Sequence, residues 1–507
     1  MHCGGEAAPR RTRECGRSGS RSLDSTGGRY RMTTMRSSGR TRGRDLARLT
    51  LILGFSLLSK LGLALQVWVR NREAVWHPDS ASYHNLALNL LRSGVFSRSS
   101  AAPYAHESFR TPGYPLLLTA LYTALGNSPL PVIVLQSVVA TGTVALTWFL
   151  GRRLFGSRVG TWAAGLLSLD IASVCSGQML MSETAFTLLV LTAIWLLVRG
   201  LWPLRGCGGF ALSGLALACA IHVRPIGYYL APLGAAGIVA FLVLRDRTTT
   251  CRRARWRLAL TRAGSLLLAP ALLVGGWQVK NLQKTSSVRF SHLEGLNMYF
   301  YRAAGAISMR DHKPLFQVHR EMGLETERTD FTGWVAKRPE FAGRNHAALG
   351  EQWFREGIAI ILRNPGWYVL MHLRSTAALL LDPGTFCLAT LTGVETDQRG
   401  QELLARLQVA PASFLATVWA EHRFLFLSSL LALAYLAVLY AGTVLWFVRA
   451  SRTDWTPGAV VIVAVLAYFA VISAGPEAAS RFRVPLAPLL ALLSAAGWQR
   501  LCQDRVL

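Results

Sequence analysis

Long apolar stretches, each close to the length of a membrane-crossing helix, recur from residue 49 almost to the end of the chain. In helical form, about 20 apolar residues cover the roughly 30 Å of a bilayer's hydrocarbon core. The pattern predicts an all-α polytopic membrane protein with about ten transmembrane helices. The predicted spans lie near residues 49–69, 129–150, 159–175, 181–199, 207–222, 226–244, 263–279, 424–448, 456–474 and 484–500.

Two shorter segments between the first two spans have a different character. Residues 79–92 place Asp79 and Tyr83 four positions apart on one helix face. Residues 112–125 are apolar but too short, and too close to prolines, to cross a bilayer comfortably. We expect both to be helices that lie along the outer membrane surface, within a first outer loop at 70–128.

Basic residues set the expected orientation. The net charge of +27 would by itself suit a nucleic-acid partner, but the positive side chains lie in loops that flank the apolar stretches. Cytoplasmic loops of membrane proteins carry an excess of Lys and Arg, and the arginine-rich loop 245–257 therefore marks the cytoplasmic side. This predicts a multi-pass cell-membrane protein with both termini in the cytoplasm, embedded in the lipid bilayer and without a nucleic-acid partner.

Polarity divides the chain into four parts. Residues 1–48 are rich in Arg, Gly and Ser and are predicted to be a disordered cytoplasmic tail. A transmembrane module at 49–280 follows. Residues 281–423 are polar and long enough to fold as a small outer cap, with an interfacial helix near 366–381. The last transmembrane helices occupy 424–507.

With this topology, ionisable residues from several separate segments fall at the outer membrane face. They are Asp79, Glu107, Arg110, Glu183, Arg224, Lys280, Arg481 and Arg483. Cations at a membrane interface suit a lipid-linked phosphate, and a carboxylate beside them suits proton abstraction from a hydroxyl group. The set predicts group transfer from a lipid phosphate, performed outside the membrane.

Short motifs in a fixed order carry a resemblance to a known family. They are Pro-Asp-Ser-Ala-Ser-Tyr at 78–83, Phe-Arg-Thr-Pro-Gly-Tyr-Pro at 109–115, Met-Ser-Glu-Thr-Ala-Phe at 181–186, Val-Arg-Pro at 223–225, Trp-Gln-Val-Lys-Asn at 277–281 and Arg-Phe-Arg-Val-Pro-Leu-Ala-Pro at 481–488. Together they resemble the C-fold (GT-C) glycosyltransferases that use polyprenyl-phosphate sugars. The chain is most similar to the bacterial relatives of protein O-mannosyltransferases and lipid A aminoarabinose transferases, over roughly residues 49–500.

The resemblance implies roles for several residues. The acid of the first outer loop, the family's catalytic base, corresponds to Asp79, and Glu183 matches a second acid at the mouth of the fourth span. Many members carry another acid where this chain has Ser80, so a metal-bridged acid pair is not expected and no cofactor is required. The residues expected to bind the donor phosphate or sugar are Arg110, Arg224, Lys280, Arg481 and Arg483, with Tyr83, His106 and Glu107 as additional candidates.

The residues leave alternatives open for several features. Asp79 would also suit a helix cap, and Glu183 would suit an ion pair with Lys60 or Arg224. Arg481 and Arg483 are two residues apart and would share one face of an extended loop. In the predicted cap, Tyr299 and Tyr301 would either stack on a sugar or belong to an alternating strand. These alternatives stay open at the level of sequence.

The leading functional hypothesis is an inverting membrane glycosyltransferase that moves one sugar from a polyprenyl phosphate to a lipid, glycan or protein acceptor on the outer side. An O-antigen ligase or polymerase with a pyrophosphate donor is a second enzyme class. A transporter or flippase of lipid-linked sugars is the non-enzyme alternative. A transporter would be expected to place paired charges in mid-membrane and to show matched halves, and the chain has no visible internal repeat.

Overall fold

A computed structural model describes residues 39–99, 101–201, 206–245, 252–324, 331–394 and 418–504. By its contacts, the chain forms one unit from Asp45 onward, and this unit contains every residue of the sites discussed below. Most of the predicted tail, residues 1–38, lies outside the described residues, as do residues 395–417 of the predicted cap. All regular elements in the described ranges are helical, as predicted.

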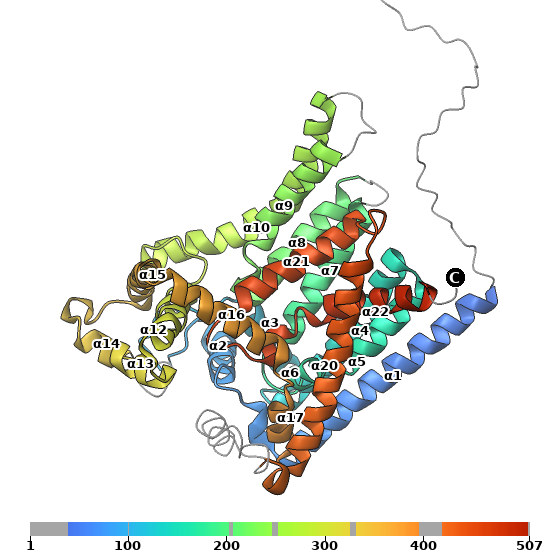
Figure 1. Cartoon of the computed structure of the whole chain (residues 1–507). Coiled ribbons are helices and arrows are strands. Elements are labelled where there is room, and N and C mark those ends of the chain that lie inside the picture. Colours follow the sequence, from blue (N-terminus) through green and yellow to red (C-terminus); the bar gives the residue numbers. More distant parts are fainter. Residues whose placement is uncertain are drawn as a thin grey trace, which may run out of the picture. The chain divides into compact units, whose positions relative to one another are not determined.

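The apolar part of this unit is built from long helices (Figure 1). In chain order these and the helices between them are α1 (Gly39–Arg70), α2 (Ser80–Ser93), α3 (Gly113–Leu125), α4 (Pro129–Phe155), α5 (Ser157–Ser168), α6 (Ile171–Ser176), α7 (Glu183–Leu201), α8 (Gly208–Val223), α9 (Leu230–Ala240), α10 (Arg252–Thr285), α20 (Arg423–Arg449), α21 (Pro457–Ser473) and α22 (Ala487–Asp504). Short 3₁₀ turns η1 (Arg72–Val75), η2 (Pro225–Gly227) and η6 (Ser480–Arg483) join some of them.

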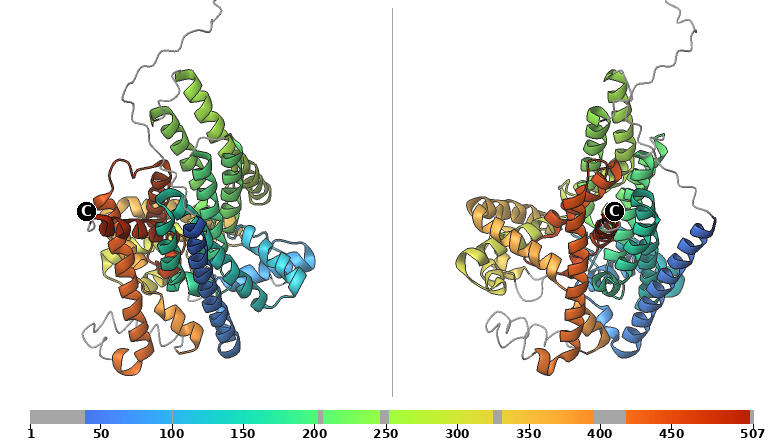
Figure 2. Two further views of the ribbon diagram at one scale, coloured as in Figure 1. Left: turned by 90° about the vertical axis from the view of Figure 1, so that its right-hand side faces the viewer. Right: turned by 45° about the vertical axis from the view of Figure 1, so that its right-hand side comes forward.

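The helices between α10 and α20 are shorter. They are α11 (Leu293–Leu296), the π-helical η4 (Asn297–Ala303), α12 (Ala304–Asp311), α13 (Leu315–Met322), α14 (Thr332–Ala336), α15 (His346–Arg363), α16 (Pro365–Leu381) and α17 (Thr385–Thr392). In Figure 1 and in the right-hand view of Figure 2, α12 to α15 form a group beside the long apolar helices.

Within the described residues, six helices are long and apolar enough to cross a membrane. They are Gly43–Arg70, Pro129–Phe155, Glu183–Leu201, Pro225–Leu244, Arg252–Thr285 and Arg423–Arg449. Three shorter apolar helices, α3, α8 and α21, accompany them. The chain is therefore a multi-pass integral membrane protein, and its described part has fewer full-length apolar helices than the ten predicted.

One predicted span is interrupted. The segment 159–175 does not form a single helix, because α5 ends at Ser168 and α6 begins at Ile171. Between them, the Asp170 carboxylate accepts hydrogen bonds from the Ser173 backbone N–H at 2.9 Å and the Ser173 hydroxyl at 2.6 Å. A residue that caps the start of a helix has a non-helical backbone conformation, and Asp170 is extended. The helix of the predicted span is therefore interrupted at Asp170. From the hydrophobic pattern alone, an aspartate that caps a helix looks the same as a polar residue inside a membrane span.

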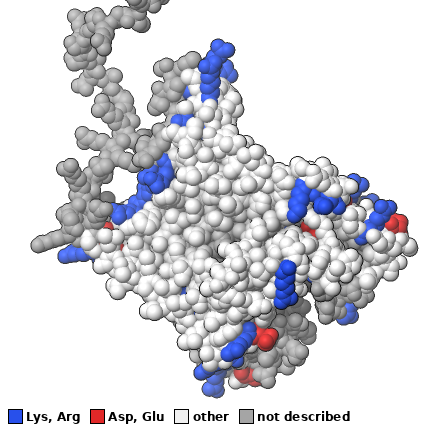
Figure 3. All heavy atoms as spheres, turned by 180° about the vertical axis from the view of Figure 1, so that it is seen from behind, with Lys and Arg blue, Asp and Glu red and all other residues white. Residues whose placement is uncertain are grey.

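The surface of the long helices suits a hydrocarbon environment. Leu51, Leu58 and Leu431 are largely exposed although they are among the most apolar residues. On the face drawn in Figure 3, charged side chains gather at the margins and leave a wide uncharged area between them. Such an area would be unfavourable in water and favours contact with lipid.

A close helix crossing places α22 inside the bundle. Most of its residues up to Gly497 are buried, and it packs against α20, α5 and α4. At the crossing with α20, a Cβ atom on Gly497 would lie 1.9 Å from the carbonyl oxygen of Gly442. Only a residue without a side chain permits this approach, which is typical of packing between membrane helices. The burial of α22 holds the preceding turn η6 against the bundle.

The predicted cap has a hydrophobic core of its own. Its centre contains the aromatic side chains of Phe300, Trp334 and Trp353, and Phe109 from the first outer loop packs into it. Tyr299 and Tyr301 lie in the π-helix η4 and are both buried in this core. The strand alternative for these tyrosines is therefore wrong, because consecutive aromatic residues here fill a helical core.

Candidate active site

Asp79 occupies the turn that leads into α2. Its backbone is at the position of a helix cap, but its side chain makes no capping hydrogen bond. Ser80 instead fixes the turn, because its hydroxyl accepts from the His77 N–H at 2.9 Å and donates to the Leu180 carbonyl at 3.0 Å. The capping interpretation of the Asp79 carboxylate is thus wrong, and the carboxylate points toward other partners.

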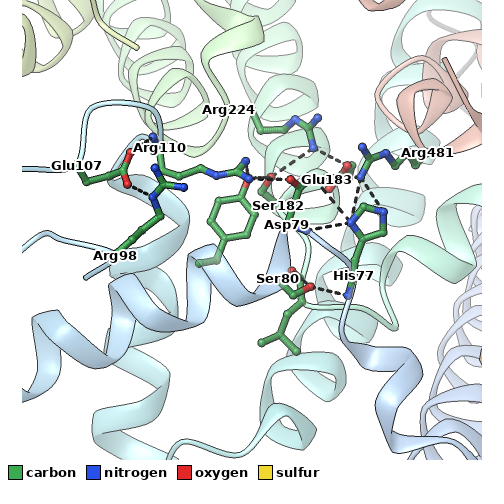
Figure 4. Close-up of polar contacts among 12 residues, drawn as sticks. His77, Asp79, Ser80, Arg98, Glu107, Arg110, Ser182, Glu183, Arg224 and Arg481 are labelled. Carbon is green, nitrogen blue, oxygen red and sulfur yellow. Dashed lines mark hydrogen bonds and ion pairs between the residues drawn. The ribbon is translucent and has the colours of Figure 1, made fainter. Parts of the chain in front are cut away.

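Two arginines from distant segments bind that carboxylate (Figure 4). Arg110 Nη2 lies 2.7 Å from Asp79 Oδ1, and Arg481 Nη1 lies 3.2 Å from Asp79 Oδ2. The His77 ring lies beside the same group, with Nδ1 3.8 Å from Asp79 Oδ2 and Nε2 3.1 Å from Arg481 Nη1. Residues far apart in the chain therefore share one charged contact.

A second ion pair lies next to the first. Arg224 Nη1 is 2.6 Å from Glu183 Oε1, at the start of α7, and 3.3 Å from the Ser182 hydroxyl. Tyr83 joins the two pairs, because its hydroxyl lies 3.5 Å from the Ser182 hydroxyl and accepts from Arg110 Nη1 at 3.4 Å. We call His77, Asp79, Tyr83, Arg110, Ser182, Glu183, Arg224 and Arg481 the arginine network.

A backbone contact brings the two halves of the network together. Gly113 begins α3 against the end of α8, where a Cβ atom would lie 2.5 Å from the His222 carbonyl carbon. This contact holds the segment that carries Arg110 next to the segment that carries Arg224. The Thr-Pro-Gly and Val-Arg-Pro motifs therefore meet in space, and the glycine is what permits the approach.

Glu107 supports Arg110 without joining the network. Its Oε1 accepts from the backbone N–H groups of Phe109 at 2.6 Å and Arg110 at 3.0 Å, and its Oε2 pairs with Arg98. The carboxylate is buried. Glu107 therefore holds the backbone of Arg110 in place, while His106 contacts Asn281 of α10 at 3.3 Å.

Two predicted donor-binding residues lie elsewhere. Arg483 is 1% exposed and donates to the backbone carbonyls of Leu379 and Asp382 at 3.2 and 2.8 Å. Arg481 and Arg483 do not share a face, because η6 is a 3₁₀ turn and not an extended loop, so residues two apart point in different directions. Lys280 lies over the Trp277 ring, 4.1 Å from its centroid.

The structure identifies the ion-pair partner of Glu183. Glu183 pairs with Arg224, and Lys60 donates to the Ser56 hydroxyl at 2.7 Å on its own helix. The Lys60 alternative is therefore wrong. The Glu183 side chain is 1% exposed, whereas that of Asp79 is 29% exposed. Of the two candidate catalytic acids, Asp79 is the one that an incoming molecule can reach.

The charges around Asp79 keep it ionised. Burial alone would raise the pKa of its carboxyl group, but Arg110, Arg481 and His77 hold the pKa well below its usual range. With three guanidinium groups against two carboxylates, the arginine network has a positive excess that suits an anion. Among the described residues, no group of three or more His, Cys, Asp or Glu side chains has the arrangement of a metal site.

Residues 110–274 match the family model described as dolichyl-phosphate-mannose-protein mannosyltransferase. The resemblance to membrane glycosyltransferases is confirmed. The matched segment contains Arg110, Glu183 and Arg224 of the arginine network, whereas Asp79 and Arg481 lie outside it. No curated protein matches the chain.

Solved structures show weaker likenesses. The apo oligosaccharyltransferase of Archaeoglobus fulgidus is 12% identical with a TM-score of 0.49, over 92% of this chain and 51% of that one. ArnT from Cupriavidus metallidurans bound to undecaprenyl phosphate is 17% identical with a TM-score of 0.37, over 88% and 78% of the two chains. The chain thus spans about half the length of the archaeal enzyme. These identities and TM-scores are too low to decide the fold or the function.

Replacing Gly113 by alanine should disturb the arginine network. The added methyl group meets backbone at His222, which cannot move as a side chain can, so we expect a loss of about 1–3 kcal/mol in stability. Gly264→Ala is the matched control, because nothing lies within 4 Å of a Cβ atom there and helix propensity favours alanine. Thermal unfolding in detergent compares the two. Equal melting temperatures for the two variants would contradict the tight contact.

The lowered pKa of Asp79 predicts a pH dependence. The unfolded chain, with an Asp pKa of about 3.9, takes up a proton that folded Asp79 rejects. The contribution of the ionised Asp79 carboxylate to the free energy of unfolding is therefore fully present above about pH 5 and declines as the pH falls below about 4. The gap in melting temperature between wild type and Asp79→Asn should narrow over that range, whereas Asp311→Asn, at an exposed pair with Arg310, should show little gap at any pH. A gap that widens on acidification would oppose this assignment.

Proposed function

We propose that this protein is an inverting glycosyltransferase that moves a sugar from a polyprenyl-phosphate donor to an acceptor hydroxyl. The observation that carries the proposal is an accessible carboxylate, Asp79, held between Arg110 and Arg481. The family match supports the reaction class, because its description names a sugar linked to a polyprenyl phosphate. A GT-C-like architecture, with the cap of residues 281–423 over an outer-facing site, belongs to the same proposal.

The arginines provide the leaving-group site. When the acceptor oxygen forms its bond to the anomeric carbon, the bond from that carbon to the phosphate oxygen breaks and its electron pair stays on the phosphate. The phosphodiester thereby becomes a monoester and gains negative charge. Arg110 and Arg481 stabilise that charge as it develops, which lowers the barrier. One displacement on the carbon inverts its configuration.

Asp79 takes the proton of the acceptor hydroxyl. A carboxylate held by two guanidinium groups is ionised, but its low pKa makes it a weak base. A donor phosphate that draws Arg481 away removes one of those charges and raises the pKa of Asp79. Donor binding and base strength are therefore coupled through Arg481.

Glu183 has a different role from the one the resemblance implies. Because its side chain is 1% exposed and pairs with Arg224, it is inaccessible to an acceptor hydroxyl. We assign it to holding Arg224 in position beside the donor phosphate. We assign the arginine network to the outer side of the membrane and both termini to the cytoplasm. The arginines at the start of α10 support this orientation, because basic residues are in excess at the cytoplasmic ends of membrane helices.

Asp79→Asn should reduce turnover by about 10²–10⁴-fold, the usual contribution of a general base. Asparagine has nearly the same shape, so the variant should still fold, and Arg110 and Arg481 should still bind the donor. The measurement is transfer of label from a polyprenyl-phosphate sugar, in membranes matched for protein content, with Asp311→Asn as the control. Near-normal turnover in Asp79→Asn together with loss in Glu183→Gln would place the base elsewhere. Movement of the intact donor across the membrane without transfer would indicate a flippase.

Arg481→Ala should weaken donor binding as well as slow the reaction. Loss of a guanidinium contact to phosphate removes affinity in the ground state and in the transition state, so KM for the donor should rise and kcat should fall. Arg483→Ala is an unsuitable comparison, because Arg483 is buried against backbone carbonyls. Arg310→Ala, at an exposed site, is the control. An unchanged donor KM in Arg481→Ala would remove Arg481 from the phosphate site.

A further inference from the structure

A cleft of about 380 Å³ lies between the start of α9, the end of α10 and the cap helices α11 and α15. Its walls include the aromatic rings of Tyr228, Tyr229 and Phe290 and the polar side chains of Gln278, Glu294 and Glu351. None of these residues belongs to the arginine network. The volume lies near the lower end of the range of small-molecule pockets, roughly 300–1,000 Å³, and suits one or two sugar rings.

The three aromatic rings differ in exposure, because Phe290 is buried and Tyr228 is half-buried against the same core. Tyr229 is exposed, and the Tyr228 and Phe290 rings are tilted at 37° with their centroids 5.9 Å apart. Gln278 Nε2 donates to the Tyr228 hydroxyl at 3.3 Å. The wall thus presents aromatic surface beside amide and hydroxyl groups. A sugar ring has the complementary surface, since its C–H groups can cover an aromatic face while its hydroxyls form hydrogen bonds.

The charge of the cleft is opposite to that of the arginine network. Arg289 Nε lies 2.8 Å from Glu351 Oε1, and Arg289 Nη1 lies 3.1 Å from Glu294 Oε2. One cation therefore serves two carboxyl groups. Burial raises the pKa of Glu294, whereas Ser287 and Arg289 hold that of Glu351 below its usual value against the effect of burial. A cleft with this balance disfavours phosphate and offers acceptors to hydroxyl groups.

Two walls of the cleft are joined directly to the arginine network. Pro225 lines the cleft and follows Arg224 in the chain. Ser291 also lines it, and its hydroxyl donates to the carbonyl of Phe109 at 2.5 Å, immediately before Arg110. A substrate whose phosphate lies on the arginines therefore has a compartment next to it that offers acceptors to hydroxyl groups.

We propose that this cleft binds a neutral saccharide ring of one of the substrates. The proposal rests on the glycosyltransferase function above, and it names the chemistry of the recognised group. The ring belongs either to the acceptor or to the sugar of the donor. Glu294, Glu351 and Gln278 hold its hydroxyls, and the aromatic wall covers its apolar face.

A binding experiment tests the cleft without any transfer reaction. The probe is methyl α-mannopyranoside, titrated into the protein in lipid nanodiscs, with binding followed by saturation-transfer NMR. Glu294→Gln and Tyr229→Ala should each weaken binding by about tenfold, the effect of losing one good contact of about 1.4 kcal/mol. Glu321→Gln, an exposed acid on α13 that pairs with Lys313, should bind as wild type does. Melting temperatures verify that each variant is folded.

Steady-state kinetics then identify the source of the ring. A rise in the acceptor KM alone in Glu294→Gln and Tyr229→Ala assigns the ring to the acceptor, and a rise in the donor KM alone assigns it to the donor sugar. Unchanged glycoside binding in both folded variants, or inorganic phosphate displacing the glycoside, overturns the proposal. If no transfer is detected but the glycoside binds and the two variants weaken it, the proposed function fails while the saccharide site stands.

Discussion

The double ion pair of Asp79 is the interaction on which the rest of the site depends. It joins the turn before α2, the loop before α3 and the turn η6 before α22, so segments from both ends of the chain meet at one carboxylate. Two guanidinium groups on one carboxylate leave a positive excess that another anion can use. The three arginines of the network are exposed to a similar degree, 15–21%, whereas Glu183 is 1% exposed and Asp79 is 29% exposed. The two acids, and not the arginines, therefore differ in what an incoming molecule can reach.

Much of this site could be predicted from the sequence. Apolar periodicity indicated most of the long helices, and charges at the ends of predicted spans selected Asp79, Arg110, Glu183, Arg224 and Arg481, all of which the structure brings into one network. Counting spans places residues at a common membrane depth but does not say which of them touch. Which residues touch depends on packing between segments that are far apart in the sequence, such as the packing of Gly113 against His222. A local sequence pattern does not reveal such packing.

The remaining errors have a common physical cause, because a hydrogen bond to a side-chain carboxylate determined the local conformation. Arg481 and Arg483 point apart since η6 is a 3₁₀ turn, and the Ser480 N–H that begins it donates to Asp382 at 2.6 Å. Asp170 breaks a span because its carboxylate caps α6. Neither feature is visible in hydrophobic periodicity, which reports which face is buried and not where a polar group finds its partner.

The same electrostatics that make the site suitable for phosphate set the order of events in the proposed reaction. While Arg110 and Arg481 both bind Asp79, the carboxylate is ionised but too weak a base to activate a hydroxyl efficiently. If the acceptor binds first, Asp79 is therefore too weak a base to take its proton efficiently. A donor that arrives first gives the arginines a second anion, relieves Asp79 of part of their positive field and so strengthens the base. A site of this kind favours donor binding before acceptor activation, since the phosphate that will leave is also the group that prepares the carboxylate.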